Sequence, residues 1–285
     1  MAFTALCAST ALFATALVSL PVCPASAPLS CHNTTAIRDK CCTEVQGQVL
    51  QVQLWDTDPA TGPSDHWGIH GLWPDFCDGS YTSYCDESRQ YTNISCILES
   101  YGKYDLLAYM REFWKNDNGD DEEFWQHEWG KHGTCYTTLQ PSCFPHYTPQ
   151  EEVVAFFEQV VHQFDRLPTY TYLAAAGILP STTETYTNAR IMAALNAARG
   201  VNATIECDDD ELYQVEYTFN VQGSVADGVF VPAEPVGEGN GCPSEGIKYL
   251  PKNESSTPTV KNTETCASGL SAEGTTAMAE YYFGS

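Results

Sequence analysis

Apolar and polar residues alternate in two segments, one near each end of the chain. Residues 49–55 alternate Val, Val and Leu with Gln, and residues 213–221 alternate Tyr, Val and Phe with Gln, Glu, Thr and Asn. Alternation with a period of two is typical of a strand with one buried face. A third run, residues 66–75, combines two His, two Trp, Gly and Pro, and is interpreted as the end of a strand that passes into a loop.

Between these strands the spacing of apolar residues changes to that of helices. Residues 98–114 have a long apolar periodicity that predicts one helix. The acidic residues 116–123 predict a loop, which is followed by a second helix in the segment 124–135.

Two further helices are predicted in the second half of the chain. Thr148-Pro-Gln-Glu151 is a capping box with Pro at the first helical position. It opens a helix whose apolar stripe consists of Val153, Phe156, Phe157, Val160, Val161 and Phe164. Residues 187–199 predict another helix, which Gly200 ends. Strands at both ends that enclose several helices predict an α+β fold with a mostly antiparallel sheet.

The two ends of the chain differ in composition from the middle. Residues 11–20 are an apolar run too short to span a bilayer and typical of a secretory signal peptide, although the residues before it include no Lys or Arg. We therefore expect residues 1–22 to be a signal peptide. Residues 253–285 are rich in Ser, Thr, Gly, Glu and Ala, and we expect a flexible tail without a lipid-anchor signal. No later segment is apolar enough to span a membrane.

Cysteine usage supports secretion. The chain has 13 Cys, and removal of Cys7 with the signal peptide leaves 12, an even number that favours disulfides in an oxidising compartment. The sequence contains no Cys-x-x-Cys pair, so a thiolate zinc site or a redox dithiol is disfavoured.

Four titratable residues lie within six positions of the segment Phe124-Trp-Gln-His-Glu-Trp-Gly-Lys-His-Gly-Thr-Cys135. At helical spacing, His127, Glu128, Lys131 and His132 span roughly 140° of one face. Any one of them alone is usually a solvated surface residue. Together, beside aromatic rings, they are costly to bury unless they are paired or used, so the cluster favours a functional site over a solvated face.

The spacing decides between a metal site and acid–base chemistry. The zinc-protease pattern needs a second His four residues after the first, but that position is Lys131, which cannot be a ligand while it is protonated. A second His-bearing segment contains His66 and His70. Two imidazoles from separate segments suit a reaction in which one takes a proton and the other gives one, because the pKa of His lies near working pH.

The runs His70-Gly-Leu-Trp-Pro and His127-Glu-Trp-Gly-Lys-His-Gly-Thr-Cys resemble the two active-site segments of the ribonuclease T2 family, the secreted acid ribonucleases. The runs Gln51-Val-Gln-Leu-Trp-Asp, Gly62-Pro-Ser-Asp, 78–89 and Gly246-Ile-Lys-Tyr resemble its fungal branch. The likeness extends over about residues 23 to 252, and it implies one disulfide-stapled catalytic domain there.

The resemblance also implies a mechanism that needs no metal or other cofactor. His132 would be the general base and His70 the general acid. His127 would hold the phosphate, and Glu128 and Lys131 would stabilise the pentacovalent intermediate. The substrate would be single-stranded RNA and the first product a 2′,3′-cyclic phosphate, later opened to a 3′-phosphate. DNA cannot form this product, because it has no 2′-hydroxyl.

Base recognition is implied for four further residues. Trp73, Asp75 and Tyr81 match a primary base pocket, and Phe124 matches a second base site. This arrangement would give low base specificity with a preference for purines, adenine above all. For each aromatic residue, ordinary core packing is the alternative interpretation.

By the same resemblance, Cys23 should pair with Cys42, Cys31 with Cys77, Cys41 with Cys143, Cys85 with Cys135, and Cys207 with Cys242. The signal peptide should then be cleaved between residues 15 and 22, so that Cys23 stays in the mature chain. Cys96 and Cys266 depart from the family pattern and either pair with each other or stay free. Gly130 lies inside the motif helix, where Gly costs up to about 1 kcal/mol relative to Ala. Four sequons are candidate glycosylation sites: Asn33, Asn93, Asn202 and Asn253.

Charge limits how such an enzyme can bind RNA. The formal net charge is −24, with 37 acidic against 13 basic residues, so binding of phosphates by the whole surface is disfavoured. We expect a local site, activity at acid pH, a monomer, and location in the medium, the wall or a vacuolar compartment. Two alternatives are a catalytically silent binding or storage protein on the same scaffold and a metalloenzyme that uses the same His residues.

Overall fold

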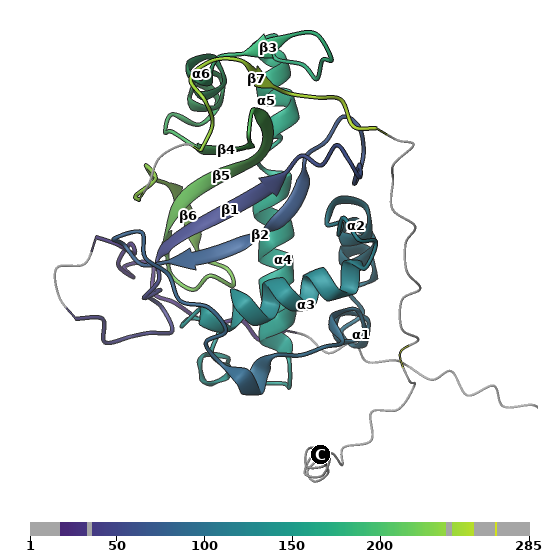
Figure 1. The fold of residues 1–285 in the computed structure, drawn as a ribbon. Coiled ribbons are helices and arrows are strands. Elements are labelled where there is room, and N and C mark those ends of the chain that lie inside the picture. The colour runs from purple at the N-terminus through teal and green to yellow at the C-terminus, as the bar shows by residue number, and fades with distance from the viewer. Residues whose placement is uncertain (1–17, 33–35, 238–240, 254–265, 267–285) are drawn as a thin grey trace, which may run out of the picture.

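The computed structural model describes residues 18–32, 36–237, 241–253 and residue 266 (Figure 1). Most of the predicted signal peptide, nearly all of the predicted tail and the sequon at Asn33 lie outside the described residues. The other three sequons, Asn93, Asn202 and Asn253, have exposed side chains. Within the described part of the chain, no helix is long and apolar enough to cross a membrane.

The described strands form one seven-stranded sheet in the order β2-β1-β5-β7-β3, with β4 and β6 also paired to β5. Every pairing is antiparallel except that of β5 with β7, which confirms the predicted mostly antiparallel sheet. The two predicted strands are the central pair. The strands are β1 (Gln48–Leu54), β2 (Gly68–Asp75), β3 (Thr185–Tyr186), β4 (Thr204–Asp208), β5 (Glu211–Gln222), β6 (Val229–Pro232) and β7 (Ile247–Lys248).

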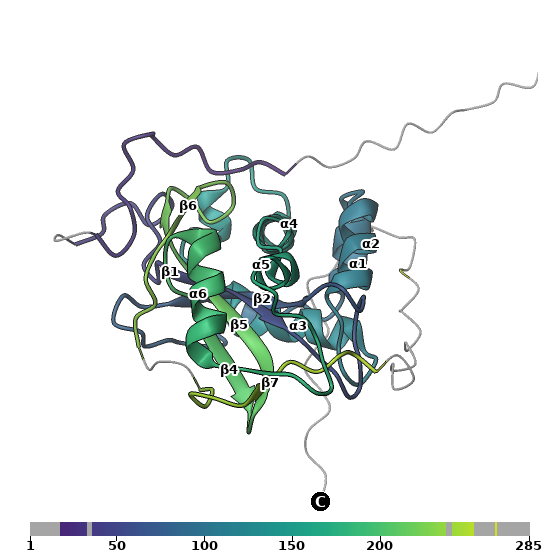
Figure 2. The ribbon, with the colours of Figure 1, turned by 90° about the horizontal axis from the view of Figure 1, so that it is seen from above.

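Six α-helices are described around this sheet. They are α1 (Ile94–Ser100), α2 (Tyr104–Phe113), α3 (Asp121–Lys131), α4 (Glu151–Asp165), α5 (Thr169–Ala175) and α6 (Asn188–Arg199). Figures 1 and 2 show α1 and α2 grouped together, away from α6, with α4 alongside the sheet. Three short 3₁₀ turns, η1 (Glu87–Arg89), η2 (Gly133–Cys135) and η3 (Pro141–Cys143), lie in the connections.

The prediction of one helix over residues 98–114 was wrong. The chain forms α1 and α2 there, separated by Tyr101–Lys103. Gly102 adopts a left-handed φ of 70°, which ends α1. The Tyr101 hydroxyl donates to the carbonyl oxygens of Thr148 and Pro149, so a contact distant in sequence fixes the break.

The other helix boundaries follow local signals. Thr187 caps α6 by accepting from the Arg190 N–H, and Gly200 follows the helix with a φ of 78°, as predicted. At α4 only half of the predicted capping box forms, since the Glu151 carboxylate accepts from the Thr148 N–H. The loop predicted over residues 116–123 ends earlier than expected, because Asp120 caps α3 by accepting from the Glu123 N–H.

The two faces of the sheet have different roles. Residues paired across strands point to the same side, so Val49, Leu72 and Phe219 share one face, while Val52, Gly71 and Glu216 share the other. The first face is mostly apolar, although the buried Gln51 and Gln53 also point to it. Val49, Ile69 and Leu72 pack in one core cluster with the buried stripe of α4, which is built around Phe156, Phe157 and Val160. The second face is more polar, and the site described next lies on it.

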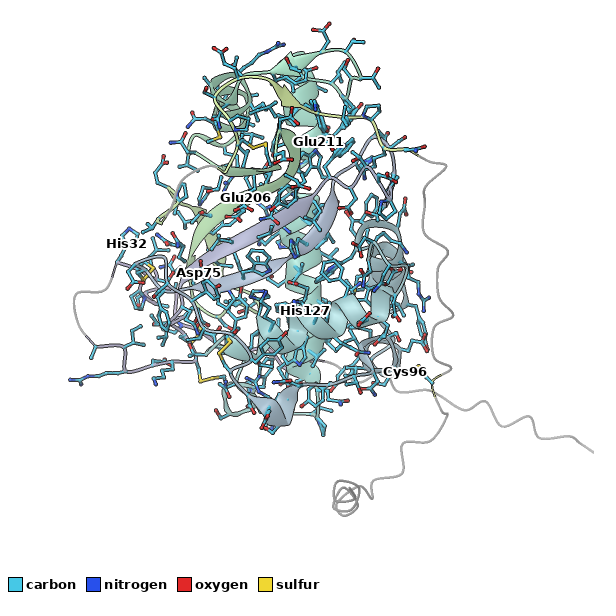
Figure 3. The ribbon with its side chains drawn as sticks, in the orientation of Figure 1. His32, Asp75, Cys96, His127, Glu206 and Glu211 are labelled. Carbon is cyan, nitrogen blue, oxygen red and sulfur yellow. A yellow bond between two sulfur atoms is a disulfide. The ribbon has the colours of Figure 1, made fainter. Side chains whose placement is uncertain are left out.

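All five disulfides implied by the resemblance are present. A sixth, Cys96–Cys266, joins α1 to a residue of the tail and settles the question that the sequence left open (Figure 3). The structure is therefore a single disulfide-stapled α+β domain.

Candidate active site

His70 lies in a β-bulge of β2. Val52 of β1 faces Gly71, and the next residue of β1, Gln53, faces Ile69, so His70 is the extra residue between them. Bulges turn a side chain away from the regular alternation and are frequent next to active sites. The interpretation of residues 66–75 as a strand end passing into a loop was wrong, because β2 continues through His70 to Asp75.

The four titratable residues of the motif lie at the end of α3. The helix ends at Lys131, and His132 caps it with helical dihedral angles, so the predicted helical spacing extends over all four. Their exposure differs sharply. The Glu128 side chain is fully buried, His132 is 5% exposed, and the His127 side chain is 42% exposed.

Glu128 is the centre of the cluster. Its Oε2 accepts a hydrogen bond of 2.9 Å from Trp73 Nε1. Its Oε1 lies 3.7 Å from His70 Nε2 and 3.9 Å from His127 Nε2, and has no hydrogen-bond partner among the described residues. Burial raises the pKa of Glu128 to about 8, while the Trp73 hydrogen bond and Lys131 oppose the shift. Glu128 is therefore a carboxyl group beside two imidazoles, with one oxygen free to receive a proton.

The approach of β2 to α3 depends on Gly71. A Cβ atom at this position would lie 2.0 Å from Glu128 Oε2 and 2.8 Å from Trp73 Nε1. Only Gly leaves room for the buried carboxylate. Gly71 was not predicted as a site residue, although its place directly after His70 was the available signal.

His132 stacks on Trp73, with ring centroids 4.9 Å apart and planes inclined by 12°. Burial lowers the pKa of His132 to about 2, and the charges of Lys131, His70 and His127 act in the same direction. The imidazole is therefore neutral over the working range, as a general base must be. Within the described structure its Nε2 has no hydrogen-bond partner.

His70 is held from two sides. Its Nδ1 lies 3.0 Å from Gln214 Oε1, and its ring makes a T-shaped contact with Trp73, with ring centroids 4.7 Å apart. Burial lowers the pKa of His70 to about 4, and Lys131 and His127 add to this effect, whereas the Gln214 hydrogen bond raises the pKa. The sequence analysis missed Gln214, because a polar residue in an alternating strand predicts only the solvent face.

His127 is the most exposed imidazole of the cluster. Its Nδ1 lies 3.3 Å from the hydroxyl of Tyr84, a second residue that the sequence analysis missed. Partial burial and Lys131 lower the pKa of His127, and Glu123 opposes them. His127 thus lies at the mouth of the site, where it can meet a ligand that arrives from solvent.

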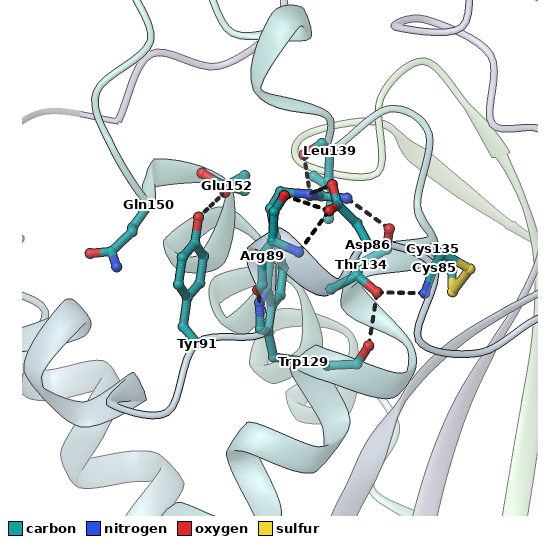
Figure 4. A network of polar contacts seen from close by, with 12 residues as sticks. Cys85, Asp86, Arg89, Tyr91, Trp129, Thr134, Cys135, Leu139, Gln150 and Glu152 are labelled. Carbon is teal, nitrogen blue, oxygen red and sulfur yellow. Dashed lines mark hydrogen bonds and ion pairs between the residues drawn. A yellow bond between two sulfur atoms is a disulfide. The ribbon is translucent and has the colours of Figure 1, made fainter. Parts of the chain in front are cut away.

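A buried polar network fixes the turn after His132 (Figure 4). The Arg89 guanidinium pairs with Asp86 at 2.8 Å and donates to the carbonyl oxygens of Thr134 and Leu139. Trp129 donates to the Arg89 carbonyl oxygen, and the Cys85–Cys135 disulfide closes the same region. Together these contacts hold the C-terminal end of α3, and with it His132, against the sheet.

The four candidate base-binding residues lie in different surroundings. Trp73 and Asp75 are half-buried on the same face of β2, and Tyr81 is 66% exposed and bridges back to Asp75 through the backbone. Core packing is thereby excluded for Tyr81. Phe124 is half-buried, packs against the core cluster and lies 5.5 Å from the His70 ring. Burial raises the pKa of Asp75 to about 7.

The fold and the site identify the family. A model of the ribonuclease T2 family matches residues 34–227. The chain belongs to this family. It is 54% identical over 230 residues to Ribonuclease Trv of Hypocrea rufa, covering 81% of this chain and 98% of that protein.

Solved ribonuclease T2 structures are similar as well. Actibind, a T2 ribonuclease, matches with a TM-score of 0.77 and 48% identity, over 81% of this chain and 98% of that one. RNase NT, solved in complex with 5′-AMP, matches with a TM-score of 0.53 and 28% identity, over 72% of this chain and 98% of that one.

Proposed function

We propose that this chain is a secreted, metal-independent endoribonuclease that cleaves single-stranded RNA by transesterification. One observation supports this most: His70 of β2 and His132 at the end of α3 both pack against the indole ring of Trp73, His70 in a T-shaped contact and His132 in a stacked one. Two imidazoles around one small space suit a reaction that takes a proton from one oxygen and gives a proton to another.

In the proposed reaction His132 removes the proton of the 2′-hydroxyl. The 2′-oxygen then forms a bond to the adjacent phosphorus, and the bond from phosphorus to the 5′-oxygen breaks. His70 gives a proton to the departing 5′-oxygen, and the product is a 2′,3′-cyclic phosphate. Water later opens the ring to a 3′-phosphate with the two proton transfers reversed.

The remaining charged groups act on the phosphate. His127, at the mouth of the site, holds the phosphate. Lys131 offsets the negative charge that grows on the pentacovalent phosphorus. Glu128 assists at the same intermediate from the buried side of the site, where its Oε1 lies near both His70 and His127. In a chain with a net charge of −24, the Lys131 ammonium is the local positive charge that attracts the backbone of RNA, and His127 adds to it when protonated.

Acid activity follows from the proposed roles. A general acid must be protonated before it can act, and burial lowers the pKa of His70 to about 4. Acid pH also neutralises part of the negative surface. Highest turnover of RNA above about pH 8 would contradict this part of the proposal.

Base recognition is proposed for Trp73, Asp75 and Tyr81, with Phe124 at a second base site. Aromatic faces can stack on a base, and Asp75 can pair with an exocyclic amino group, which favours adenine. The test is the cleavage rate at adenine relative to that at the other bases for wild type and for Asp75→Asn. A changed ratio is expected, and an unchanged ratio would remove Asp75 from the pocket.

Export and organisation belong to the same proposal. We propose residues 1–22 as the signal peptide, 23–252 as the catalytic domain and 253–285 as a flexible tail. The six disulfides support an oxidising destination. Expression of the full chain in a fungal host tests this: a monomeric, glycosylated product in the medium is expected, and retention inside the cell would contradict it.

The activity is tested by digestion of a short RNA and its all-deoxy analogue in the presence of a chelator. We expect wild type to cleave only the RNA, and His70→Phe to lose this cleavage. His66→Phe is the matched control, because His66 is half exposed and pairs with Asp65, away from the cluster. Inactivity of the wild type would favour a silent binding protein, and loss of activity on chelation would favour a metalloenzyme.

A further inference from the structure

Gln214 of β5 contacts His70 on the side away from Glu128. Its side chain is buried, with 4% of the residue exposed. The amide oxygen Oε1 lies 3.0 Å from His70 Nδ1, and the amide nitrogen Nε2 donates a hydrogen bond of 2.9 Å to Glu216 Oε1. Gln214 and Glu216 are two residues apart on one strand, so both point to the face of the sheet that bears His70. Both ends of the amide are therefore in use.

This arrangement assigns the hydrogen on His70. An amide oxygen can only accept, so the contact with Gln214 Oε1 requires a hydrogen on His70 Nδ1. Above about pH 7, where Glu216 is ionised, a flipped amide would turn its oxygen toward the Glu216 carboxylate, and two acceptors would meet. Glu216 thus sets the direction of the amide, and the amide sets the tautomer of the imidazole. The other ring nitrogen, Nε2, is left as the one that exchanges a proton, and it faces Glu128.

We propose that Gln214, held in orientation by Glu216, is a positioning residue for His70: it fixes the proton-exchanging nitrogen as Nε2 and stabilises the imidazolium. The inference rests on the proposed function, in which His70 is the general acid. Neither Gln214 nor Glu216 touches the reacting phosphate in this account, since both act through the imidazole.

The charged surroundings of His70 explain why such support is needed. From α3 the ring faces Glu128, Lys131 and His127, with His132 just beyond the helix. Burial and the two cationic neighbours Lys131 and His127 oppose a charged imidazole.

A contact from β5 favours the charged form of the His70 imidazole instead. The Gln214 oxygen favours the charged ring, because it accepts from the Nδ1–H that the imidazolium always has. Behind it Glu216 interacts with Glu206 of β4 and Asp75 of β2, and burial raises the pKa of Glu216 to about 7. Gln214 therefore separates His70 from a group of carboxyls and presents only a neutral acceptor to the ring.

The tautomer of neutral His70 can be measured directly by ¹⁵N NMR of imidazole-labelled protein without substrate. For wild type we expect hydrogen on Nδ1, and for Gln214→Met, which has a similar shape and no acceptor, a shift toward hydrogen on Nε2. Gln222→Met is the matched control, because Gln222 lies on the same strand and its amide contacts Ala25 and Ala27 instead. Wild-type His70 with hydrogen on Nε2 would overturn the inference, whether or not any variant folds.

The pH dependence of RNA cleavage gives a second measurement that a merely structural role would not alter. A general acid loses activity as pH rises through its pKa, so Gln214→Met should move this limb to lower pH by about one unit. Gln214→Glu replaces the neutral acceptor with a carboxyl group of the same shape and should move the limb to higher pH. Shifts of both variants in the same direction would contradict the proposal.

Substitutions of Glu216 test whether this residue orients the Gln214 amide. Glu216→Asp retains a carboxylate as the acceptor for the Gln214 amide and should leave the tautomer closer to that of wild type, whereas Glu216→Leu should allow hydrogen on either ring nitrogen. Equal tautomer populations in the two variants would remove Glu216 from the proposal. A wild type that shows hydrogen on Nδ1 but cleaves no RNA would instead contradict the proposed function and leave the positioning role standing.

Discussion

The indole N–H of Trp73 donates a hydrogen bond of 2.9 Å to Oε2 of the fully buried Glu128. Trp73 was predicted only as a base-binding residue, yet the same ring also stacks on His132 and makes a T-shaped contact with His70. Trp73 therefore links the carboxyl group to both proposed proton-transfer groups, and substitutions there should affect catalysis as well as base binding.

Trp73→Phe should keep an aromatic face but remove the donor to Glu128. Because its pKa is raised to about 8, Glu128 is neutral at acid pH. A hydrogen bond between neutral groups contributes about 0.5–1.5 kcal/mol, so cleavage should fall roughly twofold to tenfold. The measurement is kcat/KM at acid pH. Tyr104→Phe on α2 is the matched control, since it also keeps an aromatic ring while it removes a polar atom, and Tyr104 is 62% exposed and belongs to no proposed site. An unchanged rate for Trp73→Phe would show that the hydrogen bond does not matter to the reaction.

Glu128 gives the free energy of unfolding a pH dependence opposite in sign to that from His70 and His132. The folded pKa of Glu128 is raised from 4.5 to about 8, so its contribution is fully present below pH 4.5 and is lost as pH rises to about 8. The folded pKa of His70 is lowered from 6.5 to about 4, so its contribution is present above pH 6.5 and is lost as pH falls to about 4. The contribution of His132 to stability depends on pH with the same sign as that of His70, because its folded pKa is also lowered from 6.5.

Thermal unfolding of wild type and of Glu128→Gln, measured between about pH 4 and 8, tests whether the pKa of Glu128 is raised in the folded chain. The variant cannot ionise at this position, so its Tm should fall less than that of wild type between about pH 5 and 8. Glu112→Gln, at an exposed position on α2, should follow the wild-type curve. Parallel curves for wild type and Glu128→Gln would mean that Glu128 has an ordinary pKa in the folded chain.

Gly71→Ala should be destabilising and nearly inactive. The added Cβ would lie 2.0 Å from Glu128 Oε2, and overpacking of this kind costs about 1–3 kcal/mol. Gly130→Ala in α3 is the matched control, because its Cβ would meet no atom closer than 3.6 Å and Ala is favoured in a helix by up to about 1 kcal/mol. Chemical denaturation together with an activity assay checks both, and equal effects of the two substitutions would contradict this interpretation.

The Cys96–Cys266 disulfide should support stability without affecting catalysis. It closes a separation of 170 residues, against 35 for Cys207–Cys242, and longer closed loops gain more from a cross-link. Replacing both residues by Ser should lower the unfolding free energy by about 2–4 kcal/mol and leave kcat at acid pH unchanged. Peptide mapping without reduction checks the link itself, and free thiols at both positions would contradict it.

The parts of the fold that depend on local signals were predictable. Strand β5 alternates along its length, and α6 has Thr187 and Gly200 at its two ends, so neighbouring residues alone define both elements. The break between α1 and α2 was not predictable in this way, because Tyr101 bonds to a loop near residue 148. Apolar periodicity cannot register a contact that distant in sequence.

The site was predictable in its residue types but not in its geometry. Spacing alone brought His127, Glu128, Lys131 and His132 onto one surface, which the structure retains. It did not show that His70 occupies a bulge, since one extra residue leaves the composition of a strand unchanged. Nor did it reveal Gln214, which is 144 positions from His70 in sequence.

The central claim is that the 2′-hydroxyl of RNA is the attacking group, activated by His132 while His70 protonates the leaving oxygen. The most direct measurement is mass spectrometry of the fragments from a short RNA that contains a single 2′-deoxy residue, digested with chelator present. The account predicts no cut after the deoxy residue and 2′,3′-cyclic phosphate ends at the other early cuts. Cleavage after the deoxy residue, or fragments with 5′-phosphate ends, would contradict it.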